Sequence, residues 1–119
     1  MNNCIFCKIL DKELPAEILY EDDLVIAFPD IAKLAPVHIL VIPKEHIVSI
    51  NDLQDGENGE SIAGRLIMVA KKLAREKGID ESGYKLLFRV GKDGNQEVSH
   101  IHLHLIGGAL LSEDIHSIE

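Results

Sequence analysis

Hydrophobic and polar residues alternate in several short segments of the chain, and a period of two predicts β-strands. The clearest alternation spans residues 100–106, where three histidines are interleaved with Ile101, Leu103 and Leu105. Successive side chains of a strand point to opposite faces, so we expect an imidazole face and an aliphatic face, with neighbouring rings roughly 6–7 Å apart. Because buried polar rings need hydrogen-bond partners, packing alone does not account for three histidines in register.

The other apolar segments predict the remaining elements of the fold. They indicate a short helix at residues 4–10, strands at residues 18–21, 24–28, 38–43 and 84–90, and a glycine-containing loop at residues 91–96. The strongly apolar strand at residues 38–43 should be central in its sheet. Residues 61–77 carry apolar side chains at helical spacing and precede Gly78, which predicts one long helix.

The length and the net charge of the chain limit the number of domains and the kinds of partner that we expect. A chain of 119 residues is long enough for one hydrophobic core, so we expect a single domain over residues 1–119. The net charge of −8 argues against nucleic acid or an anionic membrane as the main partner. The sequence has no basic start followed by an apolar region and no apolar run of membrane-spanning length, so we expect a cytoplasmic protein.

The two cysteines of the chain, Cys4 and Cys7, form a C-x-x-C motif. Three interpretations are open: a redox pair, half of a zinc site, or two small buried apolar residues. Thioredoxin-type chemistry places the motif after a strand, and only three residues precede it here, so the redox interpretation ranks lowest. Two cysteines supply only half of the four ligands that structural zinc prefers.

The histidine segment permits several kinds of chemistry. Neighbouring imidazoles disfavour one another's protonation, so we expect mostly neutral rings that titrate as a group at neutral pH. A neutral imidazole acts as a nucleophile, a base or a metal ligand. The loop at residues 91–96 either presents backbone N–H groups to an anion or forms a plain hairpin turn.

These motifs together resemble the histidine-triad (HIT) family of nucleotide hydrolases and transferases. The H-x-H-x-H-x-x pattern of residues 100–106, the segments at residues 95–98 and 107–108, and the segment at residues 35–44 resemble the branch that cleaves purine nucleoside phosphoramidates. The resemblance extends from Ile5 through Gly108. It implies an α+β fold with a five-stranded antiparallel sheet, one long helix, a short N-terminal helix and a homodimer whose two sheets join.

The resemblance also implies a role for each histidine. His102 matches the nucleophile that attacks the α-phosphorus and forms a nucleotidyl-imidazole, which water then cleaves. His104 matches a phosphate-contacting residue, His100 is the first histidine of the triad, and His38 matches a fourth active-site histidine on the central strand.

Other matched positions imply contacts with a purine nucleotide. Asp30 matches the carboxylate that accepts hydrogen bonds from the ribose hydroxyls, and Gln96 matches a contact to the bridging or leaving atom. Asn95 and Glu97 match phosphate contacts. The apolar slot for the base corresponds to Phe6, Ile9, Phe28, Ile31 and Leu40.

One position departs from the family pattern. Close relatives carry an asparagine that contacts the nucleotide where this chain has Arg89. The arginine either makes a charge-assisted contact to phosphate or points away from the site.

The resemblance extends the C-x-x-C motif to a complete ligand set. In some relatives this motif joins a histidine after the central strand and the first triad histidine around zinc. The corresponding residues here are Cys4, Cys7, His46 and His100. Two thiolates and two imidazoles form a closed set, so we expect structural zinc and no cofactor for catalysis.

The resulting prediction is a hydrolase that cleaves purine nucleoside phosphoramidates through a covalent nucleotidyl-His102 intermediate. The alternatives are hydrolysis of dinucleoside polyphosphates or other nucleotide conjugates, and a nucleotide-binding regulatory protein with incidental turnover. A further alternative is a catalytic metal centre formed by His100, His102 and His104. The tail at residues 109–119 either borders the active site of a partner subunit or frays.

Overall fold

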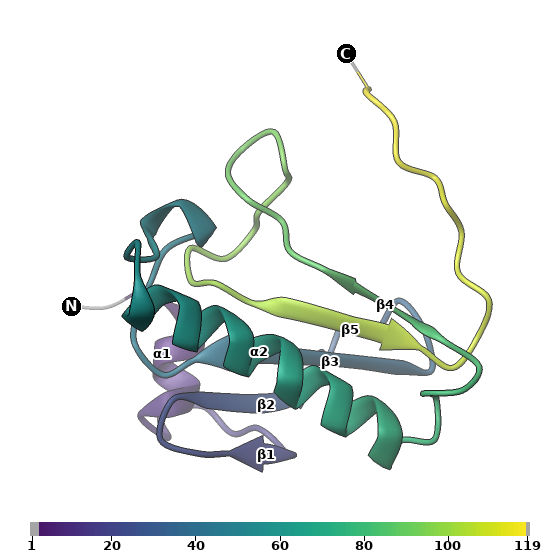
Figure 1. The fold of residues 1–119 in the computed structure, drawn as a ribbon, viewed down its shortest axis with the longest axis horizontal. Coiled ribbons are helices and arrows are strands. Elements are labelled where there is room, and N and C mark those ends of the chain that lie inside the picture. The colour runs from purple at the N-terminus through teal and green to yellow at the C-terminus, as the bar shows by residue number, and fades with distance from the viewer. Residues whose placement is uncertain (1–2, 119) are drawn as a thin grey trace.

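A five-stranded antiparallel sheet lies between a long helix and a short helix in the computed structural model, which describes residues 3–118 (Figure 1). The helices are α1 (Ile5–Leu10), the 3₁₀ turn η1 (Ile50–Asp52) and α2 (Glu57–Glu76). The strands are β1 (Tyr20–Glu21), β2 (Val25–Pro29), β3 (Val37–Pro43), β4 (Tyr84–Leu87) and β5 (Leu103–Gly107), in the order β1-β2-β3-β5-β4. The predicted α+β fold with a central third strand is confirmed.

Apolar side chains pack on both faces of the sheet. One cluster joins the sheet to α2 and includes Val41, Leu66, Leu103 and Leu105. A smaller cluster on the other face joins α1 to β2 and β3, and consists of Phe6, Ile26, Phe28, Leu40 and Ile42. The strands therefore bury both faces, and the two helices lie on opposite sides.

Helix α2 begins four residues before the predicted start at residue 61. Its first turn is polar, with Glu57 and Glu60 near the N-terminal N–H groups, so apolar periodicity did not reveal it. This turn lies so close to Gln54 that a Cβ at Gly59 would be 1.9 Å from the Gln54 carbonyl oxygen. The predicted end is confirmed, because Gly78 follows the helix with φ of +73°.

The histidine strand is shorter than predicted. β5 starts at Leu103, so His100 and His102 precede the regular ladder and the prediction of one strand over residues 100–106 was wrong. The backbone N–H of Ile101 instead donates to the Ile47 carbonyl oxygen at 2.8 Å. β4 ends at Leu87 rather than at residue 90, because its ladder with β5 ends at the Leu87–His104 pair.

The register of β3 and β5 brings two histidines together. Leu40 lies opposite His104, and His38 lies opposite Ile106. Residues opposite each other share a face, as do residues two apart on one strand. His38 and His104 are therefore diagonal neighbours on the face that carries Phe6 and Phe28.

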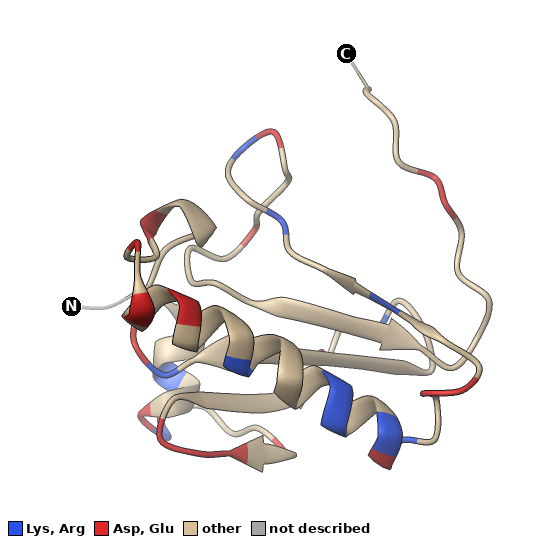
Figure 2. Ribbon diagram, in the orientation of Figure 1, with Lys and Arg blue, Asp and Glu red and all other residues tan. Residues whose placement is uncertain are grey.

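The charges of α2 follow the helix dipole. Acidic residues lie at its start, and basic residues lie near its end beside the terminal Glu76 (Figure 2). In the described part of the chain, no helix combines the length and the apolar character needed to cross a membrane.

Candidate active site

The ring of His102 is held in one orientation by the backbone. Its Nδ1 lies 2.8 Å from the carbonyl oxygen of His100. A carbonyl only accepts hydrogen bonds, so Nδ1 carries the proton and Nε2 of the neutral ring keeps its lone pair. Burial is the main cause that lowers the pKa of His102, which keeps the ring neutral at pH 7. The neutral ring therefore keeps a free lone pair on one defined atom, Nε2.

His104 and His38 form a buried pair beside His102. His38 Nε2 lies 2.9 Å from His104 Nδ1, and the centroids of the His102 and His104 rings are 4.9 Å apart, closer than the predicted spacing. The backbone N–H of Leu34 donates to His38 Nδ1 at 3.1 Å. The carboxylate of Asp30 lies 3.4 Å from His38 Nε2.

Both rings of this pair are held neutral. Burial lowers the pKa of His38, and the charge of Arg89 adds to this effect against the opposing charge of Asp30. Burial, followed by the charges of His102, Arg89 and His38, lowers the pKa of His104 to about 3. The pair can donate and accept hydrogen bonds at neutral pH without carrying a charge.

The side chain of Arg89 points into the site. Its Nη1 lies 3.1 Å from His104 Nε2, which decides the question of direction that the sequence left open. A guanidinium keeps its positive charge at all physiological pH values. A permanent cation therefore borders the neutral imidazoles.

Apolar residues border the histidines on the same face. Phe6, Phe28 and Leu40, predicted for the base slot, lie in one buried cluster, and Ile9 packs at its edge. The centroid of the Phe6 ring is 5.1 Å from that of His102. The remaining predicted residue, Ile31, is 98% exposed and does not join the cluster.

Gln96 organises the glycine loop rather than contacting His102. Its Oε1 accepts from the N–H of Gly91 at 3.0 Å, and its Nε2 donates to the carbonyl oxygens of Val48 and Val98. Asn95 is exposed with φ of +63°, a left-handed conformation that asparagine tolerates better than most residues. The side-chain amide of Gln96 thus ties the loop to the segment after β3.

Glu97 is exposed, and its carboxylate acts on His102 through its charge. That charge raises the pKa of the ring, against the larger lowering caused by burial. The predicted phosphate contacts of Asn95 and Glu97 remain predictions.

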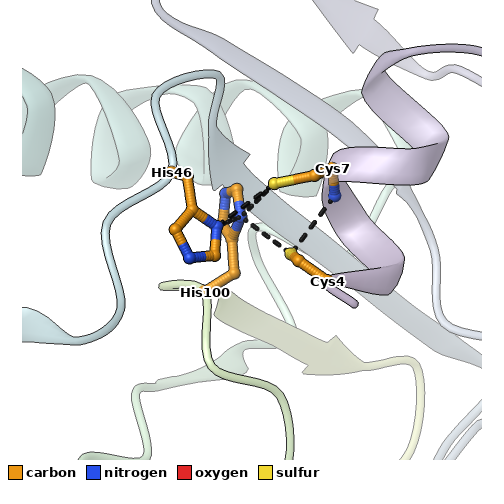
Figure 3. A group of neighbouring side chains, drawn as sticks. All are labelled: Cys4, Cys7, His46 and His100. Atoms are coloured by element: carbon orange, nitrogen blue, oxygen red, sulfur yellow. Dashed lines mark hydrogen bonds between the residues drawn. The ribbon is translucent and has the colours of Figure 1, made fainter. Parts of the chain in front are cut away.

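Cys4, Cys7, His46 and His100 converge at the other end of β3 (Figure 3). Cys4 caps α1, Cys7 lies in its first turn, His46 follows β3 and His100 precedes β5. The Cys7 sulfur lies 3.1 Å from His46 Nδ1, and the Cys4 sulfur lies 3.3 Å from His100 Nδ1. The two Nδ1 atoms are 3.2 Å apart. All four predicted ligands are therefore brought together.

The donor chemistry of this cluster fits a tetrahedral metal ion. His100 Nε2 lies 2.9 Å from the Pro43 carbonyl oxygen, so Nε2 carries the proton and the Nδ1 lone pair faces the sulfurs. Burial is the main cause that lowers the pKa of His100, which favours this neutral form. Zinc bonds of about 2.0–2.3 Å keep tetrahedral ligands about 3.3–3.8 Å apart, close to the observed separations.

The three triad histidines serve two different groups. The ring of His100 joins the cysteines, whereas that of His104 pairs with His38. The alternative of one metal centre formed by His100, His102 and His104 therefore finds no support in this arrangement. Sequence reasoning missed the carbonyl groups of Pro43 and His100 that orient the rings, because every residue has such a group and none leaves a side-chain signal.

Comparison with known proteins places this geometry in a family. The HIT domain model matches residues 11–110. The chain is 49% identical over 104 residues to the purine nucleoside phosphoramidase of Escherichia coli K12, covering 87% of this chain and 86% of that relative. A HIT family hydrolase from Legionella pneumophila Philadelphia 1 is 46% identical, with a TM-score of 0.89 over 94% of this chain and 98% of its own.

A histidine triad protein from Clostridium difficile is 43% identical to the chain, with a TM-score of 0.88. That match covers 94% of this chain and 96% of the solved structure. Family model, sequence identity and fold agree over nearly the whole length. The chain belongs to the HIT domain family.

Proposed function

We propose that the protein hydrolyses purine nucleoside phosphoramidates through a covalent nucleotidyl-His102 intermediate. The observation that carries this proposal is the hydrogen bond from His102 Nδ1–H to the His100 carbonyl, which leaves the Nε2 lone pair available for attack. The relative that is 49% identical and named purine nucleoside phosphoramidase supports the substrate class.

The proposed reaction has two displacements at phosphorus. In the first, the Nε2 lone pair of His102 forms a bond to the α-phosphorus while the P–N bond breaks, and the amine leaves with a proton taken from solvent. In the second, a water oxygen attacks the same phosphorus and loses a proton. The electron pair of the P–Nε2 bond then returns to His102, which releases the nucleoside monophosphate.

The neighbouring residues supply binding in this proposal. His104 contacts the phosphoryl group and His38 orients His104, in keeping with the short contact between their rings. Asp30 accepts hydrogen bonds from the ribose, and the apolar cluster around Phe6 receives the purine. Gln96 acts through the loop that it holds, since its amide is engaged with backbone groups.

We also propose that Cys4, Cys7, His46 and His100 hold a structural zinc ion. The converging donor atoms and the protonated Nε2 of His100 support this assignment. When bound, the ion supplies a cross-link between α1, the segment after β3 and the segment before β5.

A cytoplasmic homodimer completes the proposal. β4 is an edge strand, and the exposed Leu110 and Ile115 follow β5 in the C-terminal tail. An unpaired edge and exposed apolar side chains are suited to pairing with a second copy. Light scattering coupled to gel filtration should give twice the monomer mass.

The decisive experiment compares amine release from an adenosine phosphoramidate by the wild type, His102→Ala and Lys71→Asn. Lys71 is exposed on α2 and serves as the control. We expect turnover by the wild type and the control, and none by His102→Ala, which should still bind AMP. If the wild type binds AMP but does not release the amine, dinucleoside polyphosphates and other nucleotide conjugates are tested next as substrates. If none of these is hydrolysed either, a nucleotide-binding regulatory protein is favoured.

A further inference from the structure

A conflict between hydrogen-bond donors runs through the histidine pair. The Leu34 N–H donates to His38 Nδ1, so the proton of neutral His38 lies on Nε2 and is donated to His104 Nδ1. The proton of neutral His104 then lies on Nε2. That atom is 3.1 Å from Nη1 of Arg89, which is itself always a donor.

No choice of neutral tautomers removes this conflict. If His104 carries its proton on Nδ1 and accepts from Arg89, that proton faces the Nε2 proton of His38 across 2.9 Å. Each neutral imidazole has one donor nitrogen and one acceptor nitrogen. When two such rings lie in a row between two other donors, one of the three contacts must therefore join two donors. Asp30 offers an acceptor only on the His38 side, 3.4 Å from Nε2, and does not relieve the contact at Arg89.

We infer that Arg89 and the Nε2–H of His104 form a two-point clamp for a single anionic oxygen. This inference rests on the proposed function, in which that oxygen is a non-bridging oxygen of the nucleotide α-phosphoryl group. An anion placed against both donors converts the conflict into two hydrogen bonds, one of them charge-assisted. Arg89 is then the residue by which the site distinguishes a nucleotide from a nucleoside.

The charges around the site support this assignment. His38 and His104 have lowered pKa values and are neutral, and the charge of Arg89 contributes to both lowerings. Within residues 3–118, no carboxylate lies within 4.0 Å of the guanidinium nitrogens of Arg89. Its charge is therefore available to an incoming anion.

The test compares the affinities of the intact protein for AMP and for adenosine. Calorimetric titrations are run on the wild type, Arg89→Asn, Arg89→Lys and the control Lys71→Asn, which removes an exposed charge from α2. We expect Arg89→Asn to weaken AMP binding by about tenfold to a hundredfold and Arg89→Lys to recover part of that loss. Adenosine affinity should be the same in all four proteins, and Lys71→Asn should bind AMP as the wild type does.

Equal AMP affinity of the wild type and Arg89→Asn, or an equal loss of AMP and adenosine affinity, would overturn the inference. The second pattern is the one expected if Arg89 merely supports the fold. Thermal unfolding of Arg89→Asn shows whether the variant is folded before its affinities are compared.

A spectroscopic measurement separates the clamp from the proposed function. Nitrogen-15 shifts of the His104 ring are recorded in the wild type with saturating inorganic phosphate. We expect a proton on Nε2 and none on Nδ1; a proton on Nδ1 would contradict the clamp. If phosphate gives the expected pattern while phosphoramidates are not hydrolysed, the clamp stands and the proposed reaction is wrong.

Discussion

The backbone carbonyl of His100 accepts a hydrogen bond from the ring of His102, while the ring of His100 faces the sulfurs of Cys4 and Cys7. His100 thus joins the cysteine cluster to the proposed nucleophile. Its side chain is part of the cysteine cluster, and its main-chain carbonyl orients His102. Disturbing the cluster should therefore change the chemistry at His102, although neither cysteine takes part in the proposed reaction.

Cys7→Ala tests this link. Loss of one of four ligands should remove bound zinc, lower the unfolding temperature and slow turnover by about tenfold to a hundredfold, because the His100 carbonyl is no longer held in place. Elemental analysis, thermal unfolding and amine release measure the three effects. His116→Ala, which removes an exposed imidazole, should keep the metal. A full zinc content in Cys7→Ala would contradict the ligand assignment.

Acid should destabilise the protein well above the range in which carboxylates titrate. The pKa values of His38 and His104 are lowered in the folded protein, that of His104 to about 3, whereas unfolded histidine titrates near about 6.5. Below that value the unfolded chain binds more protons than the folded one, so stability falls as the pH decreases.

Urea unfolding at pH 7 and pH 5 measures this effect. Each histidine that stays neutral should contribute at most about 1.4 kcal/mol per pH unit below its unfolded pKa. A free energy of unfolding that is unchanged between these pH values would show that the buried rings are protonated in the folded state.

Asp22→Asn should destabilise the fold by about 2 kcal/mol. Burial raises the pKa of Asp22, but the N–H groups of Val25 and Leu24, the Tyr20 hydroxyl and Arg65 outweigh it and hold the pKa well below its usual range. The carboxylate thus fastens the β1–β2 turn to α2.

The neighbouring Asp23→Asn is the control, because that side chain is 88% exposed. Urea unfolding at pH 7 should separate the two variants. The stabilisation from Asp22 is fully present above its unfolded pKa of about 3.9 and is lost as the pH falls below it, so the difference should shrink in strong acid. Equal stabilities at pH 7 would contradict the role of Asp22.

Two glycines of α2 should respond to alanine with opposite signs. Gly64 is exposed, and a methyl group added there would meet nothing within 4 Å, so Gly64→Ala should stabilise the protein by about 0.5–1 kcal/mol. At Gly59 the same methyl would overlap the Gln54 carbonyl, so Gly59→Ala should destabilise it. Denaturant unfolding of both variants checks the signs; stabilisation by Gly59→Ala would show that the first turn of α2 moves away from Gln54.

Much of the fold was predictable because it depends on side-chain periodicity. The alternation around Leu103 and Leu105 predicted the aliphatic face that packs under α2, and this is confirmed. The same alternation was misleading at His100, because the backbone N–H of Ile101 donates a hydrogen bond to Ile47 instead of continuing the ladder of β5. The order of apolar and polar residues does not show which carbonyl a backbone N–H group will bind.

The candidate site was predictable to the extent that its chemistry lies in side chains. The cysteines and His46 are distinctive residue types at distinctive positions, and the structure brings them together with His100. The direction of Arg89 was not predictable, because residue order does not show which atom the end of a long, flexible side chain will meet. The tautomers were not predictable either, since main-chain carbonyls set them.

The cysteine cluster spans almost the whole chain, since Cys4 and His100 are 96 positions apart. During synthesis, Cys4 and Cys7 leave the ribosome long before His100. A chain interrupted before residue 100 would have at most three of the four ligands, and so would bind zinc weakly. Loading of the proposed zinc site would therefore require that translation has passed residue 100, and full-length chains made without zinc should be degraded faster than zinc-loaded ones.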